Sequence, residues 1–297
     1  MAVPPPSERA THSLDALLPS QVARKAEDVG VSKARLGAME TLALAVLAGA
    51  FIAMGAVFST TVTTASGPAL PYGVARLLAG LVFSLGLILV IVGGAELFTG
   101  NNLIVMAWIA GKLPMGRVLR NWGLVYVGNM AGALGTAVLV WLSGQYAFAG
   151  GAVGLNALGL AMHKVHLGFV SAVALGVLCN ALVCLAVWLT LAARTVTDKI
   201  TAIIFPIAAF VASGFEHCVA NMYFIPIGLL IKHDAAFLAT IGAAPDAYAA
   251  LTWHGFLLHN LLPVTLGNVI GGGGLVGVVY WFIYRRQTGP EAEGGES

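Results

Sequence analysis

Long continuous runs of apolar residues alternate with short polar or glycine- and proline-rich stretches along this chain. Six of these runs reach the length of about 20 residues that an α-helix needs to cross a bilayer. Strands are disfavoured because the runs are unbroken and lack a period of two. The pattern therefore predicts an all-α membrane protein with six transmembrane helices, at residues 37–59, 71–110, 116–143, 166–192, 198–231 and 250–284.

The remaining residues divide into connections and ends. We expect a cytoplasmic N-terminal segment over 1–36, a six-helix channel domain over 37–286 and a cytoplasmic tail over 287–297. Within the N-terminal segment, residues 15–30 have a mild helical period, which fits either a helix on the membrane surface or a solvated tail. The expected connections are 60–70, 111–115, 144–165, 193–197 and 232–249.

Composition supports this class of protein. Apolar residues make up 59% of the 297, and only 9% are Asp, Glu, Lys or Arg, against about 25% in soluble domains. So few charges argue against a soluble enzyme, a disordered chain and a nucleic-acid binder with a basic face. The three cysteines are an odd number in apolar surroundings, so they indicate no disulfide framework.

The positions of the basic residues predict the orientation. If the N-terminus lies inside, 12 of the 15 Lys and Arg residues fall on the cytoplasmic side. Arg76, Lys164 and Lys232 fall on the outer side. Cytoplasmic loops of membrane proteins carry the excess of positive charge. Both termini are therefore expected in the cytoplasm.

Two internal matches divide the chain into similar halves. Residues 94–101 and 214–221 both read G-x-E-x-x-x-x-N, at an offset of 120 residues. Residues 128–132 and 267–271 both read G-N-x-x-G, at an offset of 139. Three predicted helices in each half give the halves, about 37–143 and 166–286, opposite orientations in the membrane. This is the pattern of an inverted repeat, whose glycine-interrupted segments mark a central pathway.

Polar residues gather inside two apolar runs, the second and the fifth. Backbone freed from a helix inside a bilayer is tolerated where it is buried in protein or lines a wet cavity. We therefore expect two interrupted helices, whose half-helix N-termini can aim amide dipoles at an anion. The alternative is two continuous helices whose polar side chains only bond neighbouring helices. The clusters are Glu96, Thr99, Asn101 and Asn102, and Ser213, Gly214, Glu216, His217 and Asn221.

The glycine pairs beside the two matched asparagines allow close approach of helices. We interpret Gly128–Gly132 and Gly267–Gly271 as packing motifs, and Asn129 and Asn268 as side chains that brace the interrupted helices.

At these positions the chain resembles the formate/nitrite transporter family, and within it the formate channels. The resemblance implies an aquaporin-like six-helix protomer, a homopentamer, one substrate path through each protomer and a place in the bacterial inner membrane. It rests on Phe83–Leu87 (FSLGL), Glu96–Thr99 (ELFT), His163–His166 (HKVH), Asn180–Trp188 (NALVCLAVW), Phe205–Asn221 (FPIAAFVASGFEHCVAN) and Pro263–Gly273 (PVTLGNVIGGG).

The resemblance also implies roles for single residues. His217 is similar to the family's central pore histidine, and Thr99 to its partner on the first interrupted helix. Formate channels often carry small hydroxyl residues directly after this threonine, where this chain has Gly100–Asn102, so nitrite stays open as a substrate. The implied constrictions are Phe83, Leu87, Leu97 and Phe210; the implied path lining is Asn180 and Val183, with Lys164 near the outer entrance; the implied bracing network is Glu96, Glu216, Asn221 and Asn268.

His217 is the strongest functional candidate, because an ionisable residue inside a membrane span is expensive. An ordinary histidine pKa near 6.5 suits proton exchange with an anion at neutral pH. His217 then either protonates the anion or attracts it without releasing a proton. The plain alternative is a neutral core histidine bonded to backbone. Thr99 either donates to a carboxylate or satisfies backbone of the broken helix.

The other charged candidates have plain alternatives too. Glu96 and Glu216 are expected to accept bonds from backbone amides or to stay protonated, with cation binding as a lesser alternative. Lys164 either concentrates anions at the mouth or is an ordinary interfacial lysine. No metal-ligand spacing is found, although four histidines fall near the outer ends of their spans: His163, His166, His254 and His259.

The function predicted from these residues is a passive channel or proton-coupled transporter for formate or a related small monovalent anion. Protons, membrane lipid and further copies of the chain are its expected partners, with no cofactor and no nucleic acid. The alternative is an aquaporin-like facilitator of small neutral solutes. An intramembrane enzyme is disfavoured because no span contains HExxH, GxSxG or paired aspartates.

Overall fold

The computed structural model describes residues 15–64, 70–244 and 246–286, and within these ranges every regular element is a helix. The predicted tail 287–297 lies outside the described residues. The elements are α1 (Pro19–Arg35), α2 (Ala38–Val62), α3 (Tyr72–Gly93), η1 (Gly100–Ile104), α4 (Val105–Ile109), α5 (Met115–Leu142), η2 (Gln145–Ala147), η3 (Ala149–Gly151), α6 (Ala152–Val165), α7 (Phe169–Ala192), α8 (Val196–Ala212), α9 (Cys218–Ile231), α10 (Ala235–Thr240), η4 (Gly255–Leu261), α11 (Leu262–Val269), η5 (Ile270–Val278) and α12 (Val279–Tyr284).

Five of the described helices are long and apolar enough to cross a membrane: α2, α3, α5, α7 and the continuous helix Gly255–Tyr284. The predicted span at 198–231 is not one of them, because it divides into α8 and α9, of 17 and 14 residues. The predicted span at 71–110 also divides, since α3 ends at Gly93 and the short apolar helix Gly100–Ile109 follows.

Each of the two breaks begins at a glycine in the left-handed region. Gly94 has φ +79° and Gly214 has φ +74°, conformations that L side chains rarely adopt. Helix α3 ends at Gly93 and α8 ends at Ala212, and the backbone after each of them is non-helical up to Thr99 and His217. The expectation of interrupted rather than continuous helices is therefore confirmed.

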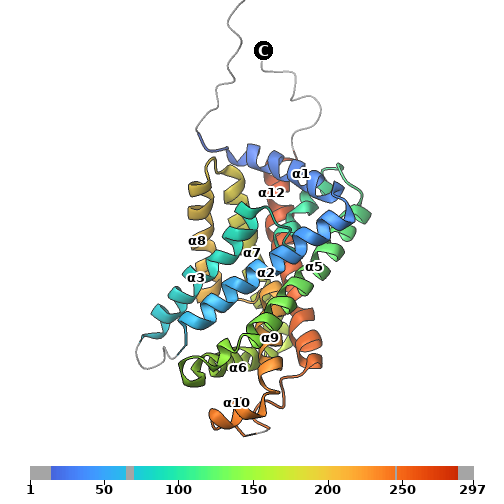
Figure 1. Cartoon of the computed structure of the whole chain (residues 1–297). Coiled ribbons are helices and arrows are strands. Elements are labelled where there is room, and N and C mark those ends of the chain that lie inside the picture. The colour runs from blue at the N-terminus through green and yellow to red at the C-terminus, as the bar shows by residue number, and fades with distance from the viewer. Residues whose placement is uncertain (1–14, 65–69, 245, 287–297) are drawn as a thin grey trace, which may run out of the picture.

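Residues 19–35 of the N-terminal segment form a helix on the bundle rather than a solvated tail. In Figure 1, α1 lies across the end of the bundle at which α12 finishes. It buries Val22, Ala23 and Ala26 against the bundle. Its buried Glu27 pairs with Lys112 and Arg285, each at 2.9 Å, so charge as well as apolar contact holds it in place.

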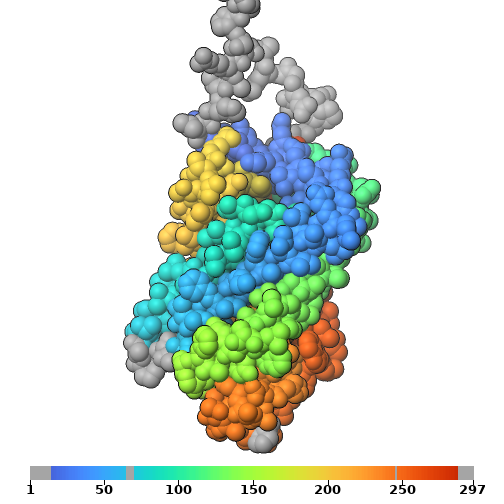
Figure 2. All heavy atoms as spheres, in the orientation of Figure 1, coloured from blue at the N-terminus to red at the C-terminus, as the bar shows by residue number. Residues whose placement is uncertain are grey.

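Two predicted connections contain helices. The stretch 144–165 holds α6, which packs on α9, and 232–249 holds α10, at the end of the molecule opposite α1 (Figure 2). The prediction of a loop at 144–165 is therefore wrong. Helix α6 is too short to span a membrane, and its last turn is polar, with His163 and Lys164. A hydropathy criterion for spans misses such a helix.

The two glycine pairs bring helices into contact, as predicted. A Cβ at Gly132 of α5 would lie 1.9 Å from the Val46 carbonyl oxygen of α2. A Cβ at Gly271 would lie 2.1 Å from the Val177 carbonyl oxygen of α7. No side chain fits at either distance, so the backbones touch at both places.

Candidate functional site

The two breaks meet in the middle of the bundle, where a histidine from one contacts a threonine from the other. His217 Nε2 lies 2.9 Å from Thr99 Oγ1, and both side chains are buried. His217 also caps α9, because its Nδ1 accepts a hydrogen bond from the Ala220 backbone N–H at 3.1 Å. The sequence offered either a pathway residue or a core histidine bonded to backbone, and this imidazole has both kinds of contact.

The hydrogen bonds of His217 define its tautomer. A ring nitrogen that accepts an N–H carries no proton, so the proton of the neutral ring is on Nε2. The ring therefore donates from Nε2 to Thr99 Oγ1. In this neutral form, Nε2 is the ring atom of His217 that can donate a hydrogen bond to a molecule bound next to Thr99.

Matched asparagines hold the two breaks. Asn129 Oδ1 accepts from the Phe98 backbone N–H, and Asn268 Oδ1 accepts from the Cys218 backbone N–H, both at 2.9 Å. Each Nδ2 donates to the carbonyl oxygen of the nearby glutamate, Glu96 O or Glu216 O, at 2.9 Å. The two asparagine side chains therefore form hydrogen bonds with backbone groups that have no partner within a helix.

The two glutamates have matched side-chain partners. Glu96 accepts from Lys33 at 2.5 Å and from Asn101 at 2.7 Å. Glu216 accepts from Lys164 and from Asn221, both at 2.7 Å. The expectation of backbone amide partners is wrong, because each glutamate side chain contacts a lysine ammonium and accepts from an asparagine amide. The alternative of protonated acids stays a prediction.

Three members of these networks were missed from the sequence: Lys33, Asn121 and Asn260. Asn101 donates to Asn121 Oδ1 at 2.9 Å, and Asn221 donates to Asn260 Oδ1 at 2.7 Å. Asn121 and Asn260 are 139 residues apart, the offset that also relates the two bracing asparagines. That offset was the available signal for them. Lys33 had none, because it belongs to α1 rather than to a predicted span.

Lys164 lies deeper than a lysine at an outer mouth. Its side chain is 12% exposed and is paired with Glu216, whose side chain is 3% exposed. Its ammonium also lies 5.3 Å from the ring centre of Phe224. The charge of Lys164 is therefore balanced locally, which weakens any pull on a distant anion.

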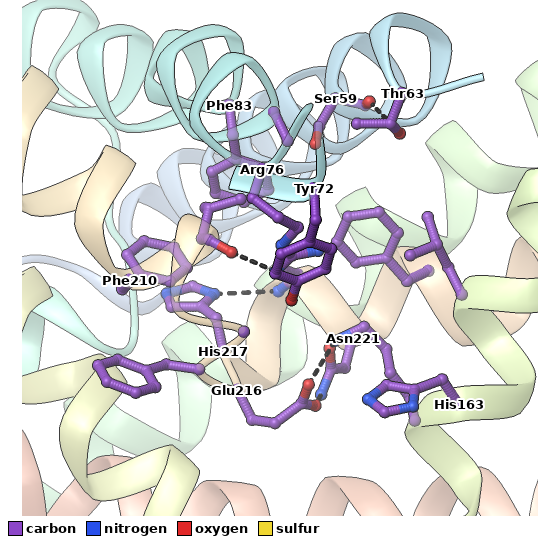
Figure 3. A pocket seen from close by; sticks show the side chains of 18 residues that line it. Ser59, Thr63, Tyr72, Arg76, Phe83, His163, Phe210, Glu216, His217 and Asn221 are labelled. Atoms are coloured by element: carbon purple, nitrogen blue, oxygen red, sulfur yellow. Dashed lines mark hydrogen bonds and ion pairs between the residues drawn. The ribbon is translucent and has the colours of Figure 1, made fainter. Parts of the chain in front are cut away.

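A cavity of about 150 Å³ opens over His217. Figure 3 shows Phe210, Glu216 and Asn221 beside the histidine, with Arg76 and Tyr72 of α3 on the other side. Lys164 and His163 of α6 complete the polar wall. The cavity is thus lined by helices from both halves of the chain and ends on the imidazole.

Apolar side chains close the path beyond this cavity. Phe83 and Phe210 meet edge to face with ring centres 5.7 Å apart. A second, smaller space of about 10 Å³ lies next to them, against about 150 Å³ for the first cavity. Its walls combine the predicted residues His217, Phe83, Phe210, Leu87, Leu97 and Val183 with Ile52 and Ile207.

Asn180, which the resemblance implied as path lining, is not among the residues that line either cavity. Its Nδ2 is 2.7 Å from the Asn268 carbonyl oxygen, 2.8 Å from Asn102 Oδ1 and 3.3 Å from the Thr99 carbonyl oxygen. Its amide is therefore engaged by backbone and by Asn102 around the first break. Among the described residues, no group of three or more His, Cys, Asp or Glu side chains can hold a metal ion.

A family model described as formate/nitrite transporter matches residues 20–282 of this chain. The formate channel FocA of Escherichia coli (strain K12) is 48% identical over 282 residues, which cover 94% of this chain and 99% of the relative. The formate channel FocA of Haemophilus influenzae is 44% identical over 92% of this chain and 96% of the relative.

Solved structures match in fold. A structure described as a pentameric formate channel with formate bound has a TM-score of 0.79 and 48% identity, and covers 83% of this chain and 97% of its own. A second, described as an FNT family ion channel, has a TM-score of 0.76 and 29% identity, with coverage of 89% and 99%.

Proposed function

Since this chain belongs to the formate/nitrite transporter family, we propose that it moves formate across the bacterial inner membrane as a passive channel or proton-coupled transporter. The observation that carries the proposal is His217, which lines the inner end of the outer cavity and contacts Thr99 Oγ1 at 2.9 Å. Identity of 48% to a formate channel over nearly the whole chain supports formate as the substrate, with nitrite as the second candidate.

His217 acts on the anion at the narrowest part of the path. An anion that enters an apolar passage loses its water at high cost. The Nε2–H of His217 and the Thr99 hydroxyl lie together there. Both can donate to a carboxylate oxygen once the anion replaces Thr99 Oγ1 as the acceptor of the Nε2–H. The anion is then held by two donors at the point where water is lost.

Proton transfer requires one further step. To give a proton and remain neutral, the ring must first hold protons on both nitrogens. Protonation of Nδ1 breaks the hydrogen bond that Nδ1 accepts from the Ala220 backbone N–H. The imidazolium then transfers one proton to formate, and neutral formic acid crosses the apolar constriction at lower cost than the anion.

The same proposal includes the topology and the assembly. We take the protein to have six spans in an aquaporin-like inverted repeat, with α8 and α9 together forming the fifth. The paired networks around Glu96 and Glu216 support the repeat, and the excess of inner Lys and Arg supports cytoplasmic termini. A pentameric relative supports a homopentamer with one path in each protomer, surrounded by lipid.

The test is uptake of labelled formate and nitrite into proteoliposomes between pH 5 and pH 8, with wild type beside His217→Asn. We expect formate uptake that rises toward low pH in the wild type, and loss of that pH dependence in the variant. Unchanged pH dependence in the variant contradicts a proton-exchanging role for His217. Transport of glycerol or water without formate transport supports the facilitator of neutral solutes instead.

A further inference from the structure

Arg76 is a cation in the outer cavity. It belongs neither to the predicted path residues nor to the hydrogen-bond networks around Glu96 and Glu216. It lies on α3, is half-buried and lines the cavity that ends on His217. Its Nε donates to the Ala212 carbonyl oxygen at 3.2 Å, and its Nη2 donates to the Val211 carbonyl oxygen. Among the described residues it forms no ion pair with a carboxylate.

The carbonyl groups that Arg76 contacts belong to a helix end inside the protein. Helix α8 finishes at Ala212, beside the second break. The last carbonyls of a helix lack partners in the helix and carry about half a negative charge together. Val211 and Gly214 line the outer cavity, so this negative end faces the space that an anion must enter. Without a cation there, the cavity would repel the anion.

The charge balance in the cavity differs between its two outer cations. Lys164 is neutralised by Glu216 at 2.7 Å. Arg76 opposes only a partial charge, so a net positive charge remains beside the path. A guanidinium has five N–H donors in a planar fork, and only Nε and Nη2 contact α8. Donors are left for a carboxylate, which arginine binds well.

We propose that Arg76 sets the affinity of the outer cavity for the anion, by cancelling the α8 end and offering free N–H groups to a small carboxylate. This inference rests on the proposed transport of formate. It makes Arg76 a binding residue for an anion on its way to His217.

The opposite break lacks such a cation, which gives the inference a direction. The position that corresponds to Arg76 at the offset of 120 residues is Val196, an exposed apolar residue. Arg76 should therefore affect entry of the anion from the outer side and leave entry from the other side unchanged.

The test compares wild type with Arg76→Gln, Arg76→Lys and the control Lys232→Gln, in right-side-out and inside-out membrane vesicles. Lys232 is an outer basic residue that is not among those lining the cavity. We expect Arg76→Gln to raise the KM for formate entering from the outer side about fivefold at low ionic strength. The ratio should shrink in concentrated sodium gluconate, because salt screens exposed charges. Arg76→Lys should raise this KM less than Arg76→Gln does, because lysine keeps the positive charge and loses the planar fork of donors. Lys232→Gln should match wild type.

A KM that Arg76→Gln leaves unchanged overturns the inference. So does a change of equal size in both vesicle orientations or at all salt concentrations, because that pattern indicates a structural role only. If Arg76→Gln does not assemble, the salt dependence of the outer KM of wild type and Arg76→Lys decides, and its absence counts against the inference. Absence of any formate flux in the wild type contradicts the proposed function instead.

Discussion

At the scale of the residue, the site depends on pairs of side chains that satisfy each other. The buried Glu96 and Glu216 each contact a lysine and an asparagine. A buried charge is costly unless it is paired and hydrogen-bonded. The pairing removes that cost next to the path and leaves the His217–Thr99 contact free to act on a molecule between the breaks.

The role proposed for Thr99 can be tested by removing its hydroxyl. Thr99→Val keeps the shape and loses the donor, so we expect the formate uptake rate to fall about tenfold, the value of one hydrogen bond to a charged group. Thr99→Ser keeps the donor and should remain close to wild type. Initial rates in proteoliposomes measure both. The control is Thr136→Val, because among the described residues the Thr136 hydroxyl bonds the Gly132 carbonyl oxygen of its own helix. Equal rates for Thr99→Val and wild type would remove Thr99 from the path.

At the scale of the element, close helix contacts decide how the bundle is built. The backbones of α2 and α5 touch at Gly132, and those of α7 and η5 touch at Gly271. In a membrane such contacts supply packing energy that the hydrophobic effect does not supply between helices. They also fix the position of Asn129, on the same helix as Gly132, against the first break.

A pair of glycine substitutions separates packing from helix propensity. Gly132→Ala should lower the thermal unfolding temperature by several degrees, because its Cβ would lie 1.9 Å from a backbone oxygen. Gly135→Ala, on the same helix with nothing within 4 Å, should be neutral or stabilising by about 0.5 kcal/mol. Thermal unfolding of the detergent-purified protein measures both. Equal melting temperatures for the two variants would show that the contact at Gly132 does not matter.

The outer helix α10 carries a pH-dependent contact. Tyr146 donates to Asp234 Oδ2 at 2.6 Å, and the Phe237 backbone N–H donates to Oδ1 at 3.0 Å. The Tyr146 hydrogen bond, followed by that backbone bond, lowers the pKa of Asp234 below its usual value. A lowered pKa in the folded state adds stability above the unfolded pKa of about 3.9, and this stability is lost as the pH falls through the folded pKa.

Asp234→Asn should therefore lower the unfolding temperature by about 1 to 2 °C at pH 6, where the native carboxylate is charged. The difference from wild type should shrink toward pH 3. The measurement is thermal unfolding across that range, with Asp246→Asn as an exposed control in the following loop. A difference that stays constant from pH 6 to pH 3 would contradict a contribution from the Asp234 charge.

At the scale of the whole molecule, much apolar surface remains exposed. Between 39% and 50% of the residues in the best apolar window of each long helix are buried within the chain. The remainder requires lipid or neighbouring copies to cover it. The homopentamer that we propose would cover part of that surface with neighbouring copies.

The proposed assembly has a direct measurement. Native mass spectrometry of the protein in mild detergent should give a mass of about five times the 30.6 kDa of the chain. Formate flux should be found in the purified fraction that contains the species of that mass. A monomeric fraction that transports formate equally well would contradict the need for assembly, although each protomer would still contain its own path.

The sequence by itself determined the features that a local pattern can encode. Continuous apolar runs required helices, since strands in a bilayer would alternate. The two matched G-x-E-x-x-x-x-N motifs located both breaks, because an apolar helix tolerates such polar clusters only where protein or water receives them. The offset of 139 residues led to the bracing asparagines Asn129 and Asn268, and the roles of His217 and Thr99 came from the family resemblance.

Only the tertiary structure decided which of these groups meet. The contact between His217 and Thr99 joins residues 118 positions apart, and Arg76 reaches α8 across 136 positions. The lysine beside Glu96 comes from α1, and the lysine beside Glu216 from α6, neither of which is a predicted span. Hydropathy records how each segment partitions into a bilayer and contains no information on which surfaces pack together. Packing alone therefore selected the partners of the buried charges.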